Sequence, residues 1–277
     1  MGIPRVKTPS EFSIEKRWRE ILLREPTPQN FQSAYDDLHR LYLAEAQGTG
    51  ELYCWMTEKV GIAISKLITG RRHVLEIGTG DGRTSLRLAR QGHSVVSIDL
   101  SKVALESASA AAAAYQDADV TYQFGDARSL RFADRSFGWV VSENLVEHLP
   151  ATEIEQHFHQ VWRVLREGGS YVFFTPSRLW DGRTSVGFHL HVYTLAEVCR
   201  IAQQCGFHTG WVEPRFLRFG DVLEVSGYML QPVFAFERLL ELWRVHRWPR
   251  WVKDRALPTI LVRARKITRL DFAGRED

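Results

Sequence analysis

The chain has 277 residues, of which 44% are hydrophobic and 25% charged, with a net charge of +3 at neutral pH. The composition excludes a disordered chain, because enough apolar side chains are present to form a core, and the length suits one α/β domain with added helices. No apolar run approaches the roughly 18 residues of a spanning helix, which argues against an integral membrane protein.

The compartment is predicted from the cysteines and the N-terminus. Cys54, Cys199 and Cys205 form no CxxC pair, and such a scattered odd set favours free thiols in a reducing compartment. The opening residues, 1–6, lack a secretory apolar core. We therefore expect a cytoplasmic protein.

Residues 1–70 are predicted to form a helical lead-in or cap. Thr8-Pro9-Ser10-Glu11 combines an N-cap, a proline at the first helical position and a glutamate three residues after the cap. Helix-like sequence continues from Phe31 to about Ile68, with an interruption near Gly48-Thr49-Gly50. The main domain is expected to follow, over residues 71–277.

From His73, short apolar runs alternate with amphipathic or alanine-rich stretches, a pattern typical of strand–helix units around a buried parallel sheet. The predicted strands are Val74–Gly78, Ser94–Asp99, Val120–Phe124, Trp139–Ser142, Tyr171–Thr175, His208–Glu213 and Thr259–Lys266. The predicted fold class is α/β, a doubly wound, mostly parallel seven-stranded sheet with helices on both faces, N-terminal helices and a helical insertion at 216–257 before the last strand.

Two capping boxes predict helices in the second half of the sheet. Thr152-Glu153-Ile154-Glu155 predicts a helix that ends at Gly168-Gly169, and Thr194-Leu195-Ala196-Glu197 predicts one that ends at Cys205-Gly206. His157 and His159 fall in the first of these helices and are expected to lie at the surface.

A glycine-rich turn follows the first predicted strand, in the sequence Val74-Leu75-Glu76-Ile77-Gly78-Thr79-Gly80-Asp81-Gly82. Glycines in such a turn let the backbone come close to a ligand. A dinucleotide fingerprint starting at Gly78 requires a glycine at position 83, where Arg83 stands instead. The spacing therefore disfavours a nicotinamide dinucleotide site.

Glu76, Gly78, Gly80 and Gly82 resemble the first motif of class I S-adenosylmethionine-dependent methyltransferases, an acid followed by G-x-G-x-G. The resemblance continues in unbroken order from about Val74 to Pro176. It implies a Rossmann-like fold, S-adenosyl-L-methionine as the cofactor and S-adenosyl-L-homocysteine as the product. It also assigns the methionine end of the cofactor to the turn, with Glu76, Gly78, Thr79 and Gly80 as candidates.

The ends of the next strands supply further candidates. Asp99 lies 19 residues after Gly80, close to the ~20 expected for an acid that binds ribose hydroxyls. The resemblance implies that Asp126 accepts a hydrogen bond from the adenine amino group and that the segment around Glu143 lies beside the cofactor. The cofactor-binding candidates outside the turn are Asp99, Leu100, Asp126, Ala127 and Glu143. Gly138 stands where the family commonly has Asp, which removes one polar anchor.

Histidines after the fifth and fourth strands are the candidate catalytic residues. His189 and His191 alternate, so an extended backbone would place both on one face. Either could act as a general base toward an oxygen or neutral nitrogen acceptor, and His148 ranks below them. Packed or solvent-facing histidines without a catalytic role are the favoured interpretation. We expect no metal, because no third ligand has an evident position.

The segment from Arg215 to Arg269 holds 12 basic and 5 acidic residues, a local charge of +7. It contains Phe234, Phe236, Leu240, Trp243, Trp248 and Trp251 among arginines. Packing on the sheet is the favoured interpretation, and peripheral membrane or lipophilic-substrate contact through residues 234–255 is the alternative. No nucleic-acid partner is expected, because the basic residues form no recognisable module.

The sequence as a whole predicts a methyltransferase that acts on a small-molecule acceptor. Oxygen is the favoured acceptor atom, in an isoprenoid, glycan or other secondary metabolite. The alternatives are a nicotinamide-dinucleotide-dependent oxidoreductase and a non-catalytic, methyltransferase-like binding scaffold. The oligomeric state is not predicted.

Overall fold

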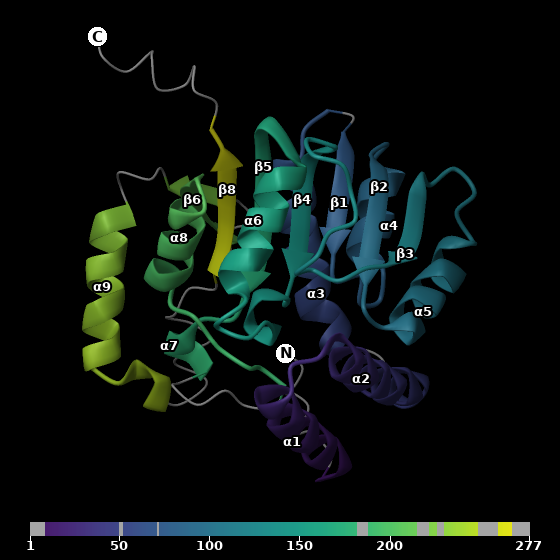
Figure 1. The fold of residues 1–277 in the computed structure, drawn as a ribbon, viewed down its shortest axis with the longest axis horizontal. Helices are drawn as coiled ribbons and strands as arrows, with labels where there is room; N and C mark the ends of the chain where they lie inside the picture. The colour runs from purple at the N-terminus through teal and green to yellow at the C-terminus, as the bar shows by residue number, and fades with distance from the viewer. Residues whose placement is uncertain are drawn as a thin grey trace. The chain divides into compact units, whose positions relative to one another are not determined.

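A computed structural model describes residues 9–49, 52–70, 72–181, 188–214, 222–225, 230–248 and 260–267 (Figure 1). The chain divides into two compact units. The first unit consists of Met1–Ala127 and Ser185–Leu190, and the second unit of Arg128–Thr184 and His191–Asp277. None of the described helices has the length and apolar content that crossing a bilayer requires.

The first unit combines three helices with three alternating strand–helix elements. They are α1 (Pro9–Arg24), α2 (Pro28–Thr49), α3 (Leu52–Leu67), β1 (His73–Ile77), α4 (Arg83–Arg90), β2 (Ser94–Asp99), α5 (Lys102–Ala112) and β3 (Val120–Phe124). Both β1 and β3 pair with β2 in parallel. Apolar side chains explain the core, because Leu75 of β1, Ile98 of β2 and Leu88 of α4 are almost completely buried.

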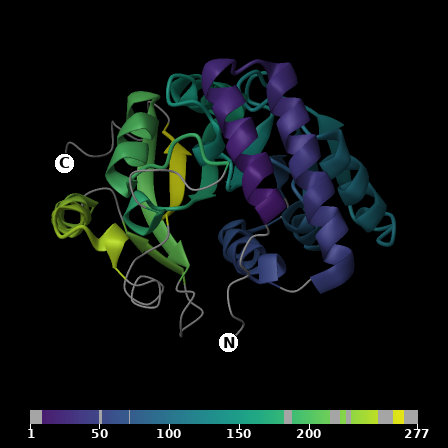
Figure 2. The same ribbon diagram turned by 90° about the horizontal axis from the view of Figure 1, so that it is seen from below.

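The N-terminal helices belong to the same compact unit as β1–β3. Helices α1 and α2 lie side by side, as Figure 2 shows. Their shared core consists of Trp18, Leu22, Phe31, Ala34 and Leu38, together with Phe188 and Leu190. Helix α2 also packs on α5. A domain boundary near residue 70 stays a prediction, and the proposed cap at Thr8 lies outside the described residues.

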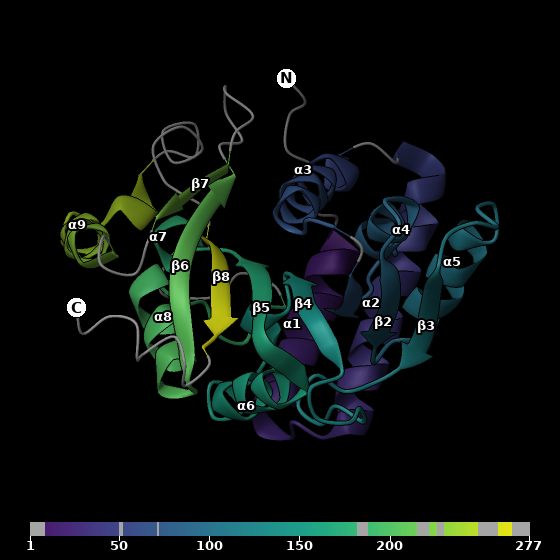
Figure 3. The ribbon, with the colours of Figure 1, turned by 90° about the horizontal axis from the view of Figure 1, so that it is seen from above.

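The second unit contains the remaining elements. They are β4 (Phe137–Glu143), η1 (Val146–His148), α6 (Ile154–Val164), β5 (Leu165–Thr175), α7 (Arg178–Asp181), α8 (Leu195–Gln204), β6 (Phe207–Pro214), β7 (Val222–Val225), α9 (Leu230–Leu242), η3 (Val245–Arg247) and β8 (Ile260–Lys266). Strands β4 and β5 are parallel, whereas β8 runs antiparallel to both β5 and β6 (Figure 3).

The strand order is β3-β2-β1-β4-β5-β8-β6-β7. All seven predicted strands are present, and the α/β, mostly parallel fold class is confirmed. The eighth strand, β7, lies inside the segment predicted as a helical insertion, so a purely helical insertion is wrong. Residues 222–225 pair antiparallel with β6, on the side of β6 away from β8.

The two capping boxes have different outcomes. The box at Thr194 is confirmed, with both reciprocal hydrogen bonds to Glu197. The box at Thr152 is wrong, because α6 has Glu153 at its N-cap without a side-chain hydrogen bond. Its predicted end at Gly168-Gly169 is wrong as well, since these glycines lie within β5, where the pairing with β4 shifts register.

The expectation for His157 is also wrong. His157 is completely buried, with Nε2 2.9 Å from the hydroxyl of Tyr171, which lies 2.7 Å from Oγ of Ser142. A buried polar group requires partners, and this chain of contacts provides them. His159, two residues away, is exposed as expected.

Gly82 is predicted to be required by packing as well as by backbone conformation. A Cβ at Gly82, where φ is +75°, would lie 2.6 Å from Cβ of Ala108. We expect Gly82→Ala to lower the free energy of unfolding by about 2–5 kcal/mol, combining left-handed strain with overpacking. Urea denaturation measures the loss.

Gly92→Ala is the matched control, because Gly92 has φ +87° with nothing within 4 Å of its Cβ position. It carries the backbone strain alone, of about 1–3 kcal/mol. Equal losses in the two variants would contradict the packing role of Gly82.

Candidate functional site

The turn between β1 and α4 is built by glycines with left-handed backbone angles. Gly78, Gly80 and Gly82 have φ values of 87°, 54° and 75°. The amides of Gly78 and Thr79 both donate to the carbonyl of Ile98, at 2.8 and 3.2 Å, and so tie the turn to β2. A Cβ at Gly80 would meet nothing within 4 Å, so this part of the turn borders open space. The turn therefore leaves room for a ligand at Gly80.

The carboxylate of Asp99 connects the turn to the start of α5. Its Oδ2 accepts from the amide of Gly80 at 3.1 Å, and its Oδ1 accepts from the amide of Ser101 at 2.8 Å. A carboxylate offers about four acceptor positions, so each oxygen retains capacity for a further donor. Asp99 can thus hold the turn and still accept hydrogen bonds from a diol such as ribose.

Asp36 of α2 supports the same strand end, and the sequence analysis missed it. Its Oδ1 accepts from Oγ of Ser101 at 2.7 Å and from the amide of Val103 at 3.3 Å. Ser101 Oγ accepts in turn from the amide of Ala104, which caps α5. The serine cap is a recognisable sequence signal, but Asp36 lies 65 residues away and no local pattern connects it with Ser101.

The end of β3 brings Asp126 near Asp99 along the sheet edge. The amide of Gly125 donates to the carbonyl of Asp99 at 3.1 Å. A Cβ at Gly125 would lie 2.9 Å from Cδ1 of Ile98, so glycine is needed for this close approach. Asp126 is half-buried, Ala127 is buried, and Leu100 packs on the core of α1 and α2.

Glu76 is buried below the turn, in a network of hydroxyl groups. Ser97 donates to Oε2 of Glu76 and lies 2.7 Å from Oγ1 of Thr79. Burial raises the pKa of Glu76 from 4.5 to about 8, and hydrogen bonds from Ser97 and Ser85 offset only part of that effect. Because nearby Asp81 and Asp99 add further repulsion, a cationic ligand beside Glu76 would favour its ionised form. This group of carboxylates therefore fits a positively charged cofactor.

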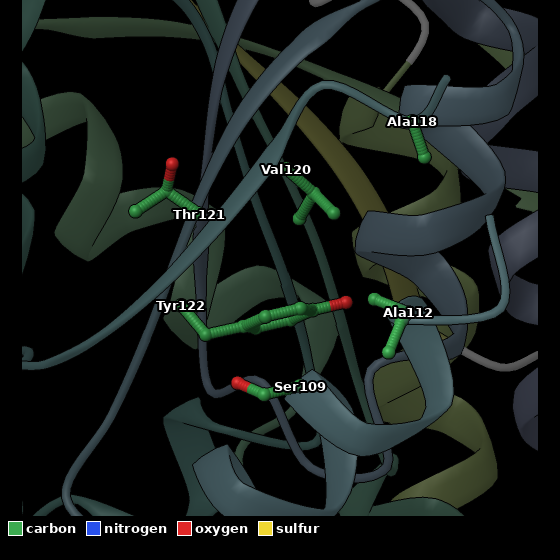
Figure 4. A pocket seen from close by; sticks show the side chains of 7 residues that line it. Ser109, Ala112, Ala118, Val120, Thr121 and Tyr122 are labelled. Carbon is green, nitrogen blue, oxygen red and sulfur yellow. The ribbon is translucent and has the colours of Figure 1, made fainter. Parts of the chain in front are cut away.

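The first unit also has a surface hollow that is separate from these residues. It lies between α5 and β3 and is lined by Ser109, Ala112, Ala113, Ala118, Val120, Thr121 and Tyr122 (Figure 4). None of the predicted site residues contributes to it. The Tyr122 hydroxyl lies 3.3 Å from Oγ of Ser85, so this side chain supports α4.

The second unit contains Glu143, His148 and His191. Glu143 ends β4 and is half-buried. His148 lies in the turn η1, with Nε2 4.0 Å from Oε1 of the buried Glu147. Glu147 accepts from Thr175 Oγ1 at 2.8 Å through Oε2, and its carbonyl accepts from the amide of His191 at 3.1 Å. Glu147, which the sequence analysis gave no role, therefore joins η1 to the segment after β5.

The electrostatic environment of His191 favours a neutral ring. Burial lowers its pKa from 6.5; the Glu197 carboxylate raises that pKa and the Arg178 guanidinium lowers it. Its ring also packs on Tyr193, with centroids 4.5 Å apart. An unprotonated imidazole at neutral pH can accept a proton.

His189 falls in the first unit and His191 in the second. The carbonyl of His189 accepts from Nε of Arg19 at 3.0 Å, which attaches this residue to α1. Residues 189–194 form neither a strand nor a helix. The two histidine side chains would share one face only if the backbone were extended, and strand pairing does not hold it so. That His189 and His191 share one face therefore stays a prediction.

Glu76 is predicted to make stability depend on pH. Its folded pKa, about 8, exceeds the ordinary value of 4.5, so its stabilising contribution is complete below about pH 4.5 and is lost as the pH rises toward 8. Glu76→Gln mimics the protonated acid. We expect it to match the native chain at pH 5 and to be more stable by on the order of 2–4 kcal/mol at pH 8.

Urea denaturation at several pH values between 5 and 8 measures this divergence. Glu106→Gln, at an exposed position of α5, is the control and should show none. Parallel stability curves for the native chain and Glu76→Gln would contradict the assignment.

Comparison with known proteins identifies a methyltransferase domain within the chain. Residues 74–169 match the family described as "Methyltransferase domain". Phosphoethanolamine N-methyltransferase 2 of Caenorhabditis elegans is 31% identical over 167 residues, covering 57% of this chain and 38% of that protein. O-methyltransferase resE of Aspergillus sclerotiorum is 32% identical over 115 residues, covering 41% and 42%. The chain thus spans less than half the length of these relatives.

Among solved structures, the [4+2]-cyclase SpnF has a TM-score of 0.63 at 18% identity, covering 88% of this chain and 98% of that one. At this identity the likeness concerns the fold alone. The sequence match begins at β1 and includes the glycine turn, Asp99 and Asp126, which are the residues that the structure brings to one sheet edge. Residues 74–169 thus match a methyltransferase domain, and over this region the resemblance to class I S-adenosylmethionine-dependent methyltransferases is confirmed.

Proposed function

We propose that this protein transfers the methyl group of S-adenosylmethionine to an oxygen atom of a small-molecule acceptor. The observation that carries the proposal is the Asp99 carboxylate, which holds the amide of Gly80 in a glycine turn directly above the buried Glu76 network. That arrangement offers acceptors for a nucleoside and a buried acid whose ionised form a cation would favour. A pyrophosphate site has the opposite requirement, namely backbone donors facing an anion.

Each cofactor residue has a distinct proposed role. When bound, S-adenosylmethionine supplies a methyl group already activated by a positively charged sulfur. The turn at Gly78–Gly80 and Glu76 hold the amino-acid end, and Asp99 accepts hydrogen bonds from the ribose hydroxyls. Asp126 accepts from the adenine amino group, with Leu100 as an apolar neighbour. Ala127 and Glu143 complete the proposed contacts.

The chemistry at the acceptor requires positioning and removal of one proton. Alignment of the acceptor oxygen with the methyl group supplies much of the acceleration. A hydroxyl acceptor also loses a proton, and we assign its removal to His191, because partial burial of its ring lowers its pKa and favours the neutral form. His189 and His148 are the other candidates for this role. An isoprenoid, a glycan or another secondary metabolite is the proposed class of acceptor.

The experiment that tests the proposal uses S-adenosylmethionine labelled in its methyl group and a panel of hydroxylated small molecules. Acceptor-dependent formation of S-adenosylhomocysteine, with the label on oxygen, is the expected result. Label on nitrogen would overturn the choice of acceptor atom. Tight cofactor binding without turnover would favour a binding scaffold, and binding of a nicotinamide dinucleotide alone would favour an oxidoreductase.

Asp126→Asn is predicted to weaken S-adenosylhomocysteine binding by roughly tenfold to a hundredfold, because a charge-assisted hydrogen bond contributes about 1.5–3 kcal/mol. Isothermal titration calorimetry measures the affinity. Asp117→Asn, at an exposed position before β3 in the same unit, is the matched control. Equal affinities for the native chain and Asp126→Asn would remove Asp126 from the site.

His191→Gln is predicted to lower kcat by about 10²–10⁴-fold, the usual contribution of a general base. In the native enzyme the acidic limb of the pH–rate profile should lie below pH 6.5, because burial lowers the His191 pKa, and the variant should lose that limb. The exposed His159 provides the control variant His159→Gln. A normal profile in His191→Gln, with loss of the limb in His148→Gln, would transfer the role to His148.

A further inference from the structure

Helix α9 lies beside α8 in the second unit, and it is anchored there by acidic residues (Figure 1). Glu237 is almost fully buried and accepts from the amides of Leu195 and Ala196, at 2.7 and 2.9 Å, at the start of α8. Glu241, one turn later, binds the guanidinium of Arg178 at 3.0 Å. Both carboxylates have favourable partners, because one accepts from amides at a helix N-terminus and the other pairs with an arginine. The two acids of α9 thus face inward.

Among the described apolar side chains of α9, Leu240 is buried, and Val233 and Phe234 are half-buried. Leu240 is buried in a small cluster with Leu179 of α7 and Val245 of η3. The left-handed residue Arg244 ends the helix and turns the chain into η3. The contact of α9 with the second unit therefore combines this small apolar cluster with the two carboxylates.

The outward face of α9 and η3 carries large apolar side chains. The exposed fractions are 56% for Phe236, 39% for Leu239, 78% for Leu242, 57% for Trp243 and 36% for Trp248. Phe236, Leu239 and Trp243 recur at spacings of three and four, so they lie on one side of the helix. An exposed apolar patch of this kind marks an interaction surface.

The exposed charged side chains beside this patch are all positive within the described residues 230–248. Arg238, Arg244 and Arg247 are exposed, whereas both acids of the segment are turned inward. Tryptophan, phenylalanine and leucine flanked by arginine are typical of helices that lie in the interface of an anionic bilayer. A solvated helix surface gains nothing from exposing two tryptophans.

We propose that the outward face of α9 and η3 binds an anionic membrane surface. The apolar side chains enter the headgroup region while the arginines contact acidic headgroups. The occupant is a lipid surface because the patch combines exposed apolar side chains with exposed arginines. The inference is independent of the methyltransferase reaction and of its acceptor.

Vesicle flotation with the full chain tests the proposal. One set of vesicles consists of phosphatidylcholine, and the other contains in addition about 30% phosphatidylglycerol, to give an anionic surface. We expect the native chain to float with the anionic vesicles only, and to be released by molar salt, which shortens electrostatic range.

Two double variants separate the apolar and charged contributions. Leu242→Ser with Trp243→Ser removes exposed apolar area, and Arg238→Gln with Arg247→Gln removes two positive charges. We expect each pair to lower binding by about tenfold or more. The apolar control is Leu23→Ser with Leu43→Ser, exposed by 53% and 40% on α1 and α2. The charge control is Lys102→Gln with Arg131→Gln, both exposed.

Unchanged binding in both controls, with circular dichroism confirming that every variant is folded, supports the proposal. Three results would overturn it: no flotation of the native chain with anionic vesicles, equal flotation with neutral vesicles, or equal loss in control and test variants. Analytical ultracentrifugation tests whether a second copy of the chain, instead of a lipid surface, covers the patch. A dimer that dissociates in the Leu242→Ser, Trp243→Ser variant would also overturn the proposal.

Discussion

The candidate cofactor site depends on one carboxylate, that of Asp99, which accepts from the amides of both Gly80 and Ser101. These two bonds fix the turn after β1 relative to the end of β2, and the amide of Gly125 then ties the end of β3 to the carbonyl of the same residue. Asp36 holds Ser101 from the other side. The N-terminal helices therefore help to position the residue that we assign to ribose.

Glu76 shows the energetic consequence of burying a carboxylate below the glycine turn. Its burial opposes ionisation, and hydrogen bonds from Ser97 and Ser85 only partly compensate. A purely structural position of this kind is more stable with an apolar or amide side chain. Perturbed carboxylates tend to occur where function needs them, and here the perturbed group lies directly below the turn that we assign to the cofactor.

The strands and the glycine turn could be predicted because their signals are local. Apolar runs ending in Gly78 and Asp99 define both the strand and its tip. Contacts between distant residues could not be predicted in this way: Asp36 meets Ser101 across 65 residues, and His157 is buried by its contact with Tyr171. The helix predicted to reach Gly168 ends earlier, because strand pairing with β4 overrides the local glycine signal.

Helix α9 shows that the sequence alone also could not predict which side of a helix is exposed. Its sequence periodicity favours packing of Phe236, Leu240 and Trp243 on the sheet, yet only Leu240 of these three is buried. Hydrophobic spacing identifies an amphipathic helix but not the direction in which its apolar side faces. That direction is set here by Glu237 and Glu241, because two satisfied carboxylates hold the polar side inward. A helix anchored through its acids leaves its aromatic side chains and arginines available to a surface outside the protein.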